Sequence, residues 1–371
     1  MQKWVKKNNK SAKPAVLKNE DKIQRNYAAI DLGTNSCRLV IADNKGNYLY
    51  KDTVATRLGE GMYAQMKFTD EAVDRGIKCF CDYKREMDKY GVSQYRAIAT
   101  ASCRMASNGL DFVRQVKERT GIEIEVIDGL EEARLNLKGA LQNVKGKSEY
   151  VVVYDLGGGS TEITLATNES DPKIIYSVSI PWGARNSSEA FDLVEYSDER
   201  AEKLRSEIAG YVREFVEKSH LKDYEGKMCF VATSSTPLRL ISKIHAFGVF
   251  DREKADGCKA SRKQFDEAIA SIYKMSRVQM AEDVYIGEKR SFIFVPACVI
   301  FKTIYDGLGV EALTASLKSA KDGIIEELVE KYGKIDKICK RGSRPSYVDG
   351  AGQNFQISGQ VFQSLAGKTI E

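Results

Sequence analysis

The hydrophobic pattern of the first third of the chain switches repeatedly between the period of a strand and that of a helix. Residues 27–30 form a short apolar segment that ends in DLGTNS, and apolar positions then alternate through 37–41, which predicts a hairpin with a polar, glycine-containing turn. Helical spacing predicts helices at 68–90, 109–120 and 130–144, with strands between them at 95–100 and 122–127. Thr69, followed by two acids, is the expected N-cap of the first of these helices. This alternation is typical of an α/β fold.

The second half begins with another apolar strand that runs into a glycine-rich turn. Residues 151–154 are followed at once by DLGGGST. Further strands are predicted at 174–180 and 228–232, and helices at about 197–219, 261–278, 292–308 and 320–331. Glycine and polar residues dominate 333–371, which is predicted to be a C-terminal tail, and residues 1–25 are predicted to be a disordered basic arm.

Composition places the net charge in one part of the chain. The 371 residues are 43% hydrophobic and 29% charged, as in a soluble globular protein with two domains. The net charge is +5, but residues 1–25 hold eight basic and two acidic side chains, so the remainder holds 49 basic and 50 acidic ones. An anionic partner of the protein body therefore has to be recognised by local positive charge.

Residue counts also exclude some kinds of site. There are only two histidines, His220 and His245, which excludes imidazole-rich zinc sites and His-Asp phosphohydrolase domains. The eight cysteines are scattered and no secretory leader is recognised, so reduced thiols and a cytoplasmic location are expected. The longest apolar run, 292–301, has about half the length of a membrane helix, so a membrane is not an expected partner. A specific nucleic acid is not an expected partner either.

An internal repeat carries the first functional signal. Shifting the chain by 124 positions lays YAAIDLGTNSCRLVIAD (27–43) over VVVYDLGGGSTEITLAT (151–167). Asp31 then falls on Asp155, and each aspartate ends an apolar strand. Two such turns are stronger support for a shared function than one, since a single glycine-containing hairpin is common.

The residue types of the repeat suit a phosphate chain. Backbone amides of Gly33, Gly157, Gly158 and Gly159 can approach an anionic oxygen, and hydroxyl and amide side chains add donors, namely Thr34, Asn35, Ser36, Ser160 and Thr161. Asp31 and Asp155 would place hard oxygen ligands for Mg²⁺ (or Mn²⁺) at two strand ends. Two facing copies would enclose phosphates between two lobes. The alternative is a pair of ordinary hairpins with turn aspartates.

Two further segments follow predicted strands. ATASCR at 99–104 places Arg104 at a strand end, where its guanidinium can bind phosphate. DGLEEAR at 128–134 opens a helix, with Glu131 and Glu132 in its first turn. Taken alone, this acidic pair is more typical of favourable interaction with the helix dipole than of catalysis.

Together these motifs resemble the exopolyphosphatase and guanosine pentaphosphate phosphohydrolase (Ppx/GppA) family, within the actin, Hsp70 and sugar kinase superfamily. The resemblance covers about residues 27–328 and rests on both loops, on ATASCR, on EEAR at 131–134, on YDLGGGSTE at 154–162 and on S-x-P-x-G at 179–183. It implies an α/β fold of two ribonuclease-H-like (actin-like ATPase) lobes with the active site in the cleft between them. It also implies the short two-domain form, with lobe I at 26–130 plus about 318–332 and lobe II at 131–317.

The resemblance implies Mg²⁺-dependent hydrolysis of the terminal phosphoanhydride of inorganic polyphosphate. Glu132 matches the glutamate that activates water, and Asp155 and Asp31 match metal-associated aspartates, so these three are the expected catalytic and metal-associated residues. Positions that match phosphate-holding residues are Asn35, Ser36, Arg104, Gly157, Gly158, Gly159 and Ser160. Phosphoryl transfer to water needs mainly positioning and charge neutralisation, which these residue types can supply.

Other functions stay open at this point. The same residues would serve guanosine pentaphosphate (pppGpp), and a superfamily kinase or a non-catalytic polyphosphate or nucleotide sensor are further alternatives. Two segments depart from the family pattern: TSSTP at 233–237 lacks the glycine of that turn, and residues 316–323 keep only part of S-D-x-G-L-R-E-G. A homodimer is neither indicated nor excluded.

Overall fold

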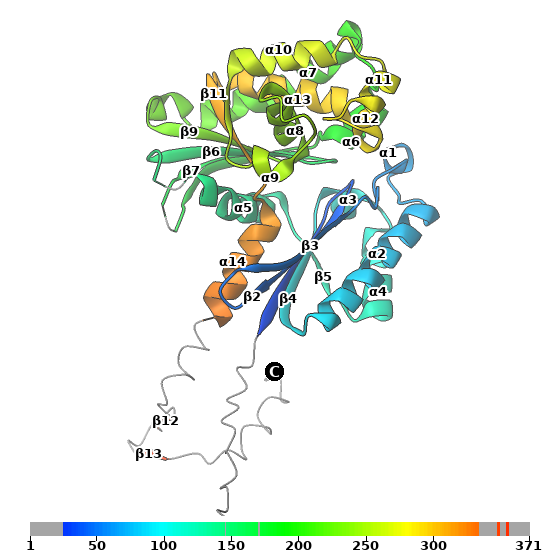
Figure 1. The fold of residues 1–371 in the computed structure, drawn as a ribbon, viewed down its shortest axis with the longest axis vertical. Coiled ribbons are helices and arrows are strands. Elements are labelled where there is room, and N and C mark those ends of the chain that lie inside the picture. Colours follow the sequence, from blue (N-terminus) through cyan, green and yellow to red (C-terminus); the bar gives the residue numbers. More distant parts are fainter. Residues whose placement is uncertain (1–24, 145, 170, 334–346, 349–353, 356–371) are drawn as a thin grey trace, which may run out of the picture.

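The computed structural model describes residues 25–144, 146–169, 171–333, 347–348 and 354–355, and the described body consists of two lobes (Figure 1). Most of the predicted basic arm and C-terminal tail lies outside these residues. The first sheet has the strand order β3 (Tyr48–Val54), β2 (Cys37–Asp43), β1 (Asn26–Leu32), β4 (Val92–Ala99) and β5 (Ile124–Val126). The second has the order β10 (Lys259–Ser261), β11 (Ala312–Ser316), β9 (Met228–Thr233), β6 (Tyr150–Leu156), β7 (Thr161–Thr167) and β8 (Ile174–Ile180).

The predicted repeat is a repeat of structure. The β1–β2 hairpin, shifted by 124 positions, falls residue for residue on the β6–β7 hairpin. In both sheets a third strand, β3 or β8, extends the hairpin antiparallel, and the first strand of the hairpin pairs in parallel with the fourth strand of its lobe, β4 or β9. The two aspartates of the loops therefore stand at the same place in two sheets of the same topology.

Helices cover both faces of the first sheet. α2 (Asp70–Lys89) and α4 (Gly109–Thr120) pack on one face with Ala28 and Ile30, whereas α14 (Ala320–Tyr332) packs on the other with Tyr27 and Ala29. This double cover explains why β1 is buried throughout. Thr69 is the N-cap of α2, as predicted, and its hydroxyl accepts a hydrogen bond from the Ala72 amide.

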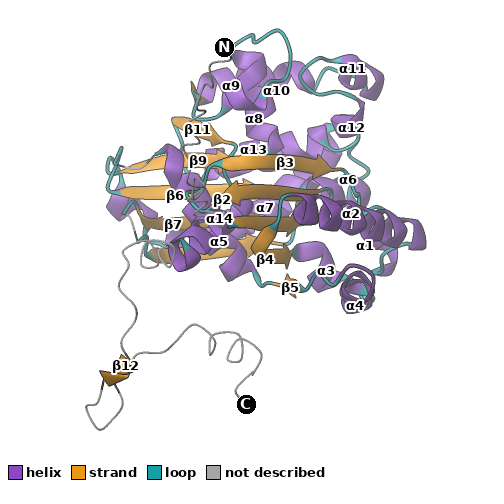
Figure 2. Cartoon of the chain, turned by 60° about the horizontal axis from the view of Figure 1, so that its bottom comes forward, coloured by secondary structure: helices purple, strands orange, loops and turns teal. Residues whose placement is uncertain are grey.

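The second sheet is covered in the same way (Figure 1), and Figure 2 shows helices around the strands of the described body. α7 (Asp198–Lys218) and α13 (Phe294–Gly307) pack on one face, and α5 (Gly129–Ala140) packs on the other. α5 and α14 also cross each other closely: a Cβ on Gly139 would lie 2.2 Å from the Ser319 carbonyl oxygen, and one on Gly323 would lie 2.3 Å from that of Leu135. Only glycine permits this crossing, which brings α14 of one sheet against α5 of the other.

Further elements complete the two lobes and the described part of the C-terminal segment. They are α1 (Met62–Gln65), α3 (Ala101–Met105), η1 (Leu141–Asn143), α6 (Ala184–Ala190), η2 (Leu221–Tyr224), α8 (Ser235–Ile244), α9 (Arg252–Ala255), α10 (Arg262–Ile272), α11 (Arg277–Glu282), α12 (Glu288–Ser291), β12 (Tyr347–Val348) and β13 (Asn354–Phe355).

The structure corrects several predicted elements. The helix expected at 261–278 is two helices, because Ser276 starts a new capping box before α11. The helix expected at 130–144 is α-helical only as far as Ala140 and is followed by the 3-10 helix η1. The sequence did not predict β3, which is an edge strand with only partial burial. It also did not predict α8, which begins inside the segment 233–237 that was expected to be a turn; Pro237 lies in the first turn of this helix, where proline is tolerated.

Candidate active site

The two glycine turns line one cavity, together with the start of α5. Eleven of the predicted residues contribute to its wall: Asp31, Gly33, Thr34, Asn35, Ser36, Glu132, Asp155, Gly157, Gly158, Gly159 and Ser160. The turns have the same backbone geometry, because the amides of Gly33 and Gly157 donate to the carbonyls of Ser36 and Ser160, both at 3.0 Å. The loops touch, and a Cβ on Gly159 would lie 2.6 Å from Oγ1 of Thr34.

The aspartates at the two strand ends have different partners. Asp31 is 5% exposed and accepts a charged hydrogen bond of 2.7 Å from Arg38, across the β1–β2 pair. Asp155 accepts hydrogen bonds from Thr233 Oγ1 at 2.6 Å and from Asn136 Nδ2 at 2.9 Å. Burial raises the pKa of Asp155, and the charge of Asp31 adds to this rise against the opposing effects of Thr233 and Arg38.

The two adjacent glutamates of α5 have different surroundings. Glu131 forms ion pairs with Arg96 at 2.8 Å and Arg134 at 2.7 Å, which lower its pKa to about 2 against the opposing effect of burial. Glu132 is 7% exposed and lines the cavity between the loops. The first acid is therefore held in a structural ion-pair network, and the second faces the candidate site.

Glu132 lies in a group of buried acids with one basic partner. Burial raises its pKa, and the nearby charge of Glu162 adds to the rise. Arg104 opposes this effect by donating to Oε2 of Glu132 at 3.1 Å, and it also donates to the Ile127 carbonyl at 2.7 Å. Arg104 thus fixes the orientation of the carboxylate.

Two predicted phosphate ligands lie outside the cavity wall. Arg104 contacts Glu132 as described, and the Thr161 hydroxyl donates to the Trp182 carbonyl at 2.8 Å. The phosphate-binding roles of Arg104 and Thr161 therefore remain predictions, whereas the structure brings the other members of the set together.

Sequence reasoning missed four side chains that belong to this region. Arg38, Asn136 and Arg290 line the cavity, and Glu162 is buried behind it, where Ser179 donates to its Oε1 at 2.9 Å and its Oε2 has no hydrogen-bond partner among the described residues. Burial and the neighbouring Asp155 raise the pKa of Glu162 to about 7. The repeat offered a signal for two of them, because Arg38 and Glu162 are equivalent positions opposite Asp31 and Asp155.

The turn that lacks a glycine keeps a glycine-like backbone. Ser234 has a φ of +98° and a ψ of 178°, a region occupied almost only by glycine. Its hydroxyl is buried and has no hydrogen-bond partner in the described part of the chain, and the residue lines the cavity beside the loops. Ser234 therefore holds, with backbone strain, a conformation that glycine adopts freely.

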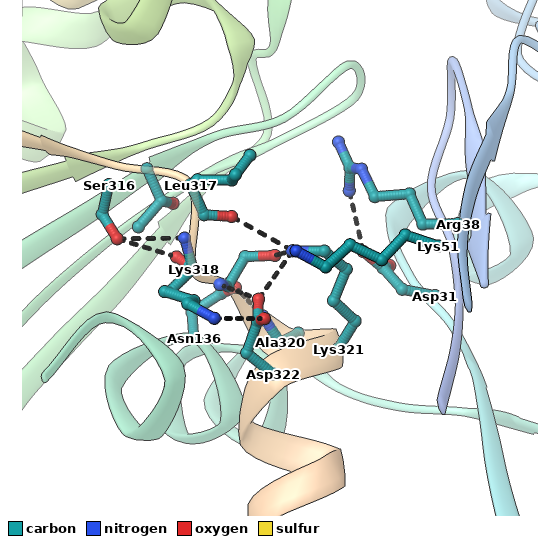
Figure 3. A network of polar contacts seen from close by, with 12 residues as sticks. Asp31, Arg38, Lys51, Asn136, Ser316, Leu317, Lys318, Ala320, Lys321 and Asp322 are labelled. Carbon is teal, nitrogen blue, oxygen red and sulfur yellow. Dashed lines mark hydrogen bonds and ion pairs between the residues drawn. The ribbon is translucent and has the colours of Figure 1, made fainter. Parts of the chain in front are cut away.

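The second departing segment forms a polar network at the start of α14 (Figure 3). Asp322 accepts from the Ser319 amide at 2.8 Å and from Lys321 Nζ at 2.6 Å. Asn136 accepts from the Ala320 amide at 2.8 Å through its side-chain oxygen while its Nδ2 donates to Asp155. The N-terminus of α14 is thereby coupled to a loop aspartate.

The described residues contain neither a cluster of metal-ligating side chains nor a membrane-spanning helix. No group of three or more His, Cys, Asp or Glu side chains there is arranged to hold a metal ion, so Asp31, Asp155 and Glu132 do not form a ready-made cluster. Within the same residues, no helix combines the length and apolar character needed to cross a bilayer.

A profile of the Ppx/GppA phosphatase family matches residues 39–332. The chain belongs to this family. It is similar to solved structures of an exopolyphosphatase from Cytophaga hutchinsonii (TM-score 0.73, 22% identity, 82% of this chain and 98% of that one) and of the Aquifex aeolicus Ppx/GppA family member (TM-score 0.65, 22% identity, 83% and 99%). These likenesses confirm the expected actin-like fold of two lobes.

A curated relative is longer than this chain. The bifunctional 3-dehydroquinate synthase/phosphatase of Fusobacterium nucleatum is 29% identical over 330 residues, which are 85% of this chain and 48% of that protein. The chain thus spans about half the length of this relative.

Proposed function

We propose that the protein is a Mg²⁺-dependent exopolyphosphatase, which hydrolyses the terminal phosphoanhydride of inorganic polyphosphate and releases orthophosphate. The observation that carries the proposal is the position of Glu132, a buried carboxylate in the wall of the cavity that the two glycine turns form. Amides and hydroxyls of the turns supply donors for phosphate oxygens, and Glu132 supplies a base.

The turns, Glu132 and Arg104 each have a separate role in the proposed reaction. The turns hold the terminal phosphoryl group, and Glu132, oriented by Arg104, accepts a proton from the attacking water. The water oxygen bonds to the terminal phosphorus as the bridging P–O bond breaks, and the electron pair of that bond leaves with the shortened chain. The raised pKa of Glu132 makes it a stronger base than an exposed glutamate.

The site also suits a divalent cation. Asp31 and Asp155 line the same cavity, and the charge of Asp31 raises the pKa of Asp155, a repulsion that a cation would relieve. These two carboxylates would hold Mg²⁺ (or Mn²⁺), which takes one or two carboxylates together with water and phosphate oxygens. When bound, the ion would neutralise negative charge on the phosphates.

Guanosine pentaphosphate is the second candidate substrate. The wall of this cavity consists of the residues expected to bind terminal phosphates, so it would also accept a 5′-triphosphate end. A non-catalytic sensor would have no use for Glu132 as a base, and a kinase would need an adenosine-binding glycine turn where this chain has Ser234, Ser235 and Thr236.

Orthophosphate release from purified protein tests the proposal. Polyphosphate and guanosine pentaphosphate are compared at equal concentrations of terminal phosphate, with MgCl₂ or with EDTA. We expect Mg²⁺-dependent release with the higher kcat/KM for polyphosphate. A higher kcat/KM for the nucleotide would favour the second candidate, and no release from either substrate would favour a sensor.

We further propose a cytoplasmic location, which the thiols support. All seven cysteines in the described part of the chain are free, as expected in a reducing compartment. Whether the protein forms a homodimer is answered by its mass in solution.

A further inference from the structure

The segment at 179–183 leads into α6, and the start of this helix supports the glycine turn of lobe II. The Ala184 amide donates to the Gly157 carbonyl at 2.9 Å, and the Arg185 amide donates to the Gly158 carbonyl at 2.7 Å. The N–H and C=O of a trans peptide point in opposite directions, so bonding these carbonyls to α6 turns the amides that follow them away from the helix.

The side chain of Arg185 extends from α6 to the glycine turn of lobe I. Its Nη2 donates to Oδ1 of Asn35 at 2.9 Å. Its Nη1 lies 3.9 Å from Oε1 of Glu189, which accepts from the Gly61 amide of lobe I at 3.3 Å. Figure 1 shows α6 next to α1 of lobe I at this contact. One short helix therefore contacts both turns.

The guanidinium of Arg185 is buried but incompletely hydrogen-bonded. The side chain is 10% exposed, and its Nε has no hydrogen-bond partner in the described part of the chain. Burial lowers the pKa of Arg185, an effect that the charge of Glu189 opposes. A buried cation with an unpaired donor is a weak source of stability, which favours a functional reason for its position.

The contact with Arg185 fixes the orientation of the Asn35 side-chain amide. Asn35 lines the cavity between the turns, and its Nδ2 donates to no described residue. Because Oδ1 accepts from the guanidinium, Nδ2 is the atom that stays available to a ligand. The reverse orientation would place two donors against each other and would offer an acceptor to phosphate.

We propose that Arg185 is a positioning residue of the phosphate site, which holds the Asn35 amide with its NH₂ group available to a phosphate oxygen and ties the turn of lobe I to the helix that supports the turn of lobe II. This inference rests on the proposed function and adds a residue to it. Arg185 is not among the residues that line the cavity, so it acts through Asn35.

A double-mutant cycle tests this coupling in a Glu132→Gln background, where turnover is slow. Arg185→Met and Asn35→Ala should each raise the Kd for inorganic tripolyphosphate at least about 5-fold, since each removes an ordered donor from the phosphate. The double variant should lose no more than about 2-fold beyond Asn35→Ala alone. Calorimetric titration in MgCl₂ measures the four proteins. Independent losses that multiply to about 25-fold or more would overturn the inference.

Two further variants distinguish positioning from other roles of Arg185. Arg185→Lys keeps a cation that can donate to Oδ1, so it should raise the Kd less than Arg185→Met does. Glu189→Gln removes the carboxylate charge near Arg185 but keeps an acceptor for the Gly61 amide, and should leave the Kd within about 2-fold. An equal loss in Glu189→Gln and Arg185→Met would contradict the role of Asn35.

Urea unfolding shows whether each variant is folded. If Arg185→Met does not fold, Arg185→Gln, whose side chain is shorter than that of arginine, replaces it in the cycle. An unchanged Kd in a folded variant would overturn the inference. If the wild type releases no orthophosphate but the cycle shows the coupling, the proposed activity fails and the positioning role of Arg185 stands.

Discussion

At the scale of residues, the two loops differ in what stands opposite their aspartate. Asp31 faces Arg38, which keeps it paired, whereas the cross-strand neighbour of Asp155 is Glu162. One copy of the repeat is thus neutralised within the protein and the other carries excess negative charge. A divalent cation held by Asp31 and Asp155 together would offset this negative charge.

Glu162 makes stability depend on pH. Its pKa is raised to about 7, so its proton stabilises the fold at low pH and that stabilisation is lost as the pH rises through about 7. Glu162→Gln keeps this side chain neutral at every pH. At about pH 8 its free energy of unfolding should therefore exceed that of the wild type by about 1–3 kcal/mol, whereas at about pH 5 the two proteins should differ little. Urea titrations in EDTA measure this. An equal difference at both pH values would contradict the raised pKa.

Backbone strain at Ser234 predicts a stabilising substitution. Ser234→Gly relieves a conformation that costs a non-glycine residue about 1–3 kcal/mol, against an entropic penalty of about 0.5–1 kcal/mol for glycine. We expect a net gain of about 1 kcal/mol in the free energy of unfolding. Ser234→Ala removes the same buried, unpaired hydroxyl but keeps the backbone strain, so the glycine variant should be the more stable of the two by about 1 kcal/mol. A loss of stability in the glycine variant would contradict the assigned strain.

At the scale of elements, the crossing of α5 and α14 links the lobes to the site. α5 carries Glu132 and Asn136, and Asn136 connects the α14 N-terminus to Asp155. Because glycines at the crossing bring the helices into backbone contact, the positions of these side chains depend on helix packing rather than on the loops alone.

Gly323→Ala tests this dependence. Its methyl group would overlap the Leu135 carbonyl, so we expect a loss of about 2 kcal/mol or more in unfolding free energy and a lower kcat. Gly210, on α7, has open space where an alanine methyl group would lie, and Gly210→Ala should instead stabilise by about 0.5–1 kcal/mol with unchanged kcat. Similar behaviour of the two variants, measured by urea unfolding and phosphate release, would show that the crossing is not tight.

At the scale of the whole molecule, the sequence predicted the two repeated hairpins and the helices with strongly periodic hydrophobic residues. The 124-residue shift located both hairpins, and helical spacing located α2, α4 and α7. The sequence could not show that Arg104 donates to Glu132, that Thr161 donates to the Trp182 carbonyl, or that Arg239 and Arg290 lie near Ser234. Each of these contacts joins residues from different elements that come together only in the folded chain. The sequence also did not show that Glu131 lies in an ion-pair network while Glu132 lines the cavity.

The most direct test of the proposed site is the single-turnover rate of orthophosphate release from polyphosphate by Glu132→Gln. Loss of the base should lower this rate at least about 10²-fold while polyphosphate still binds. Glu131→Gln changes the neighbouring acid, which is bound to Arg96 and Arg134, and should keep the rate within about 3-fold. An undiminished rate in Glu132→Gln, or equal losses in both variants, would contradict the assignment of Glu132 as the residue that activates water.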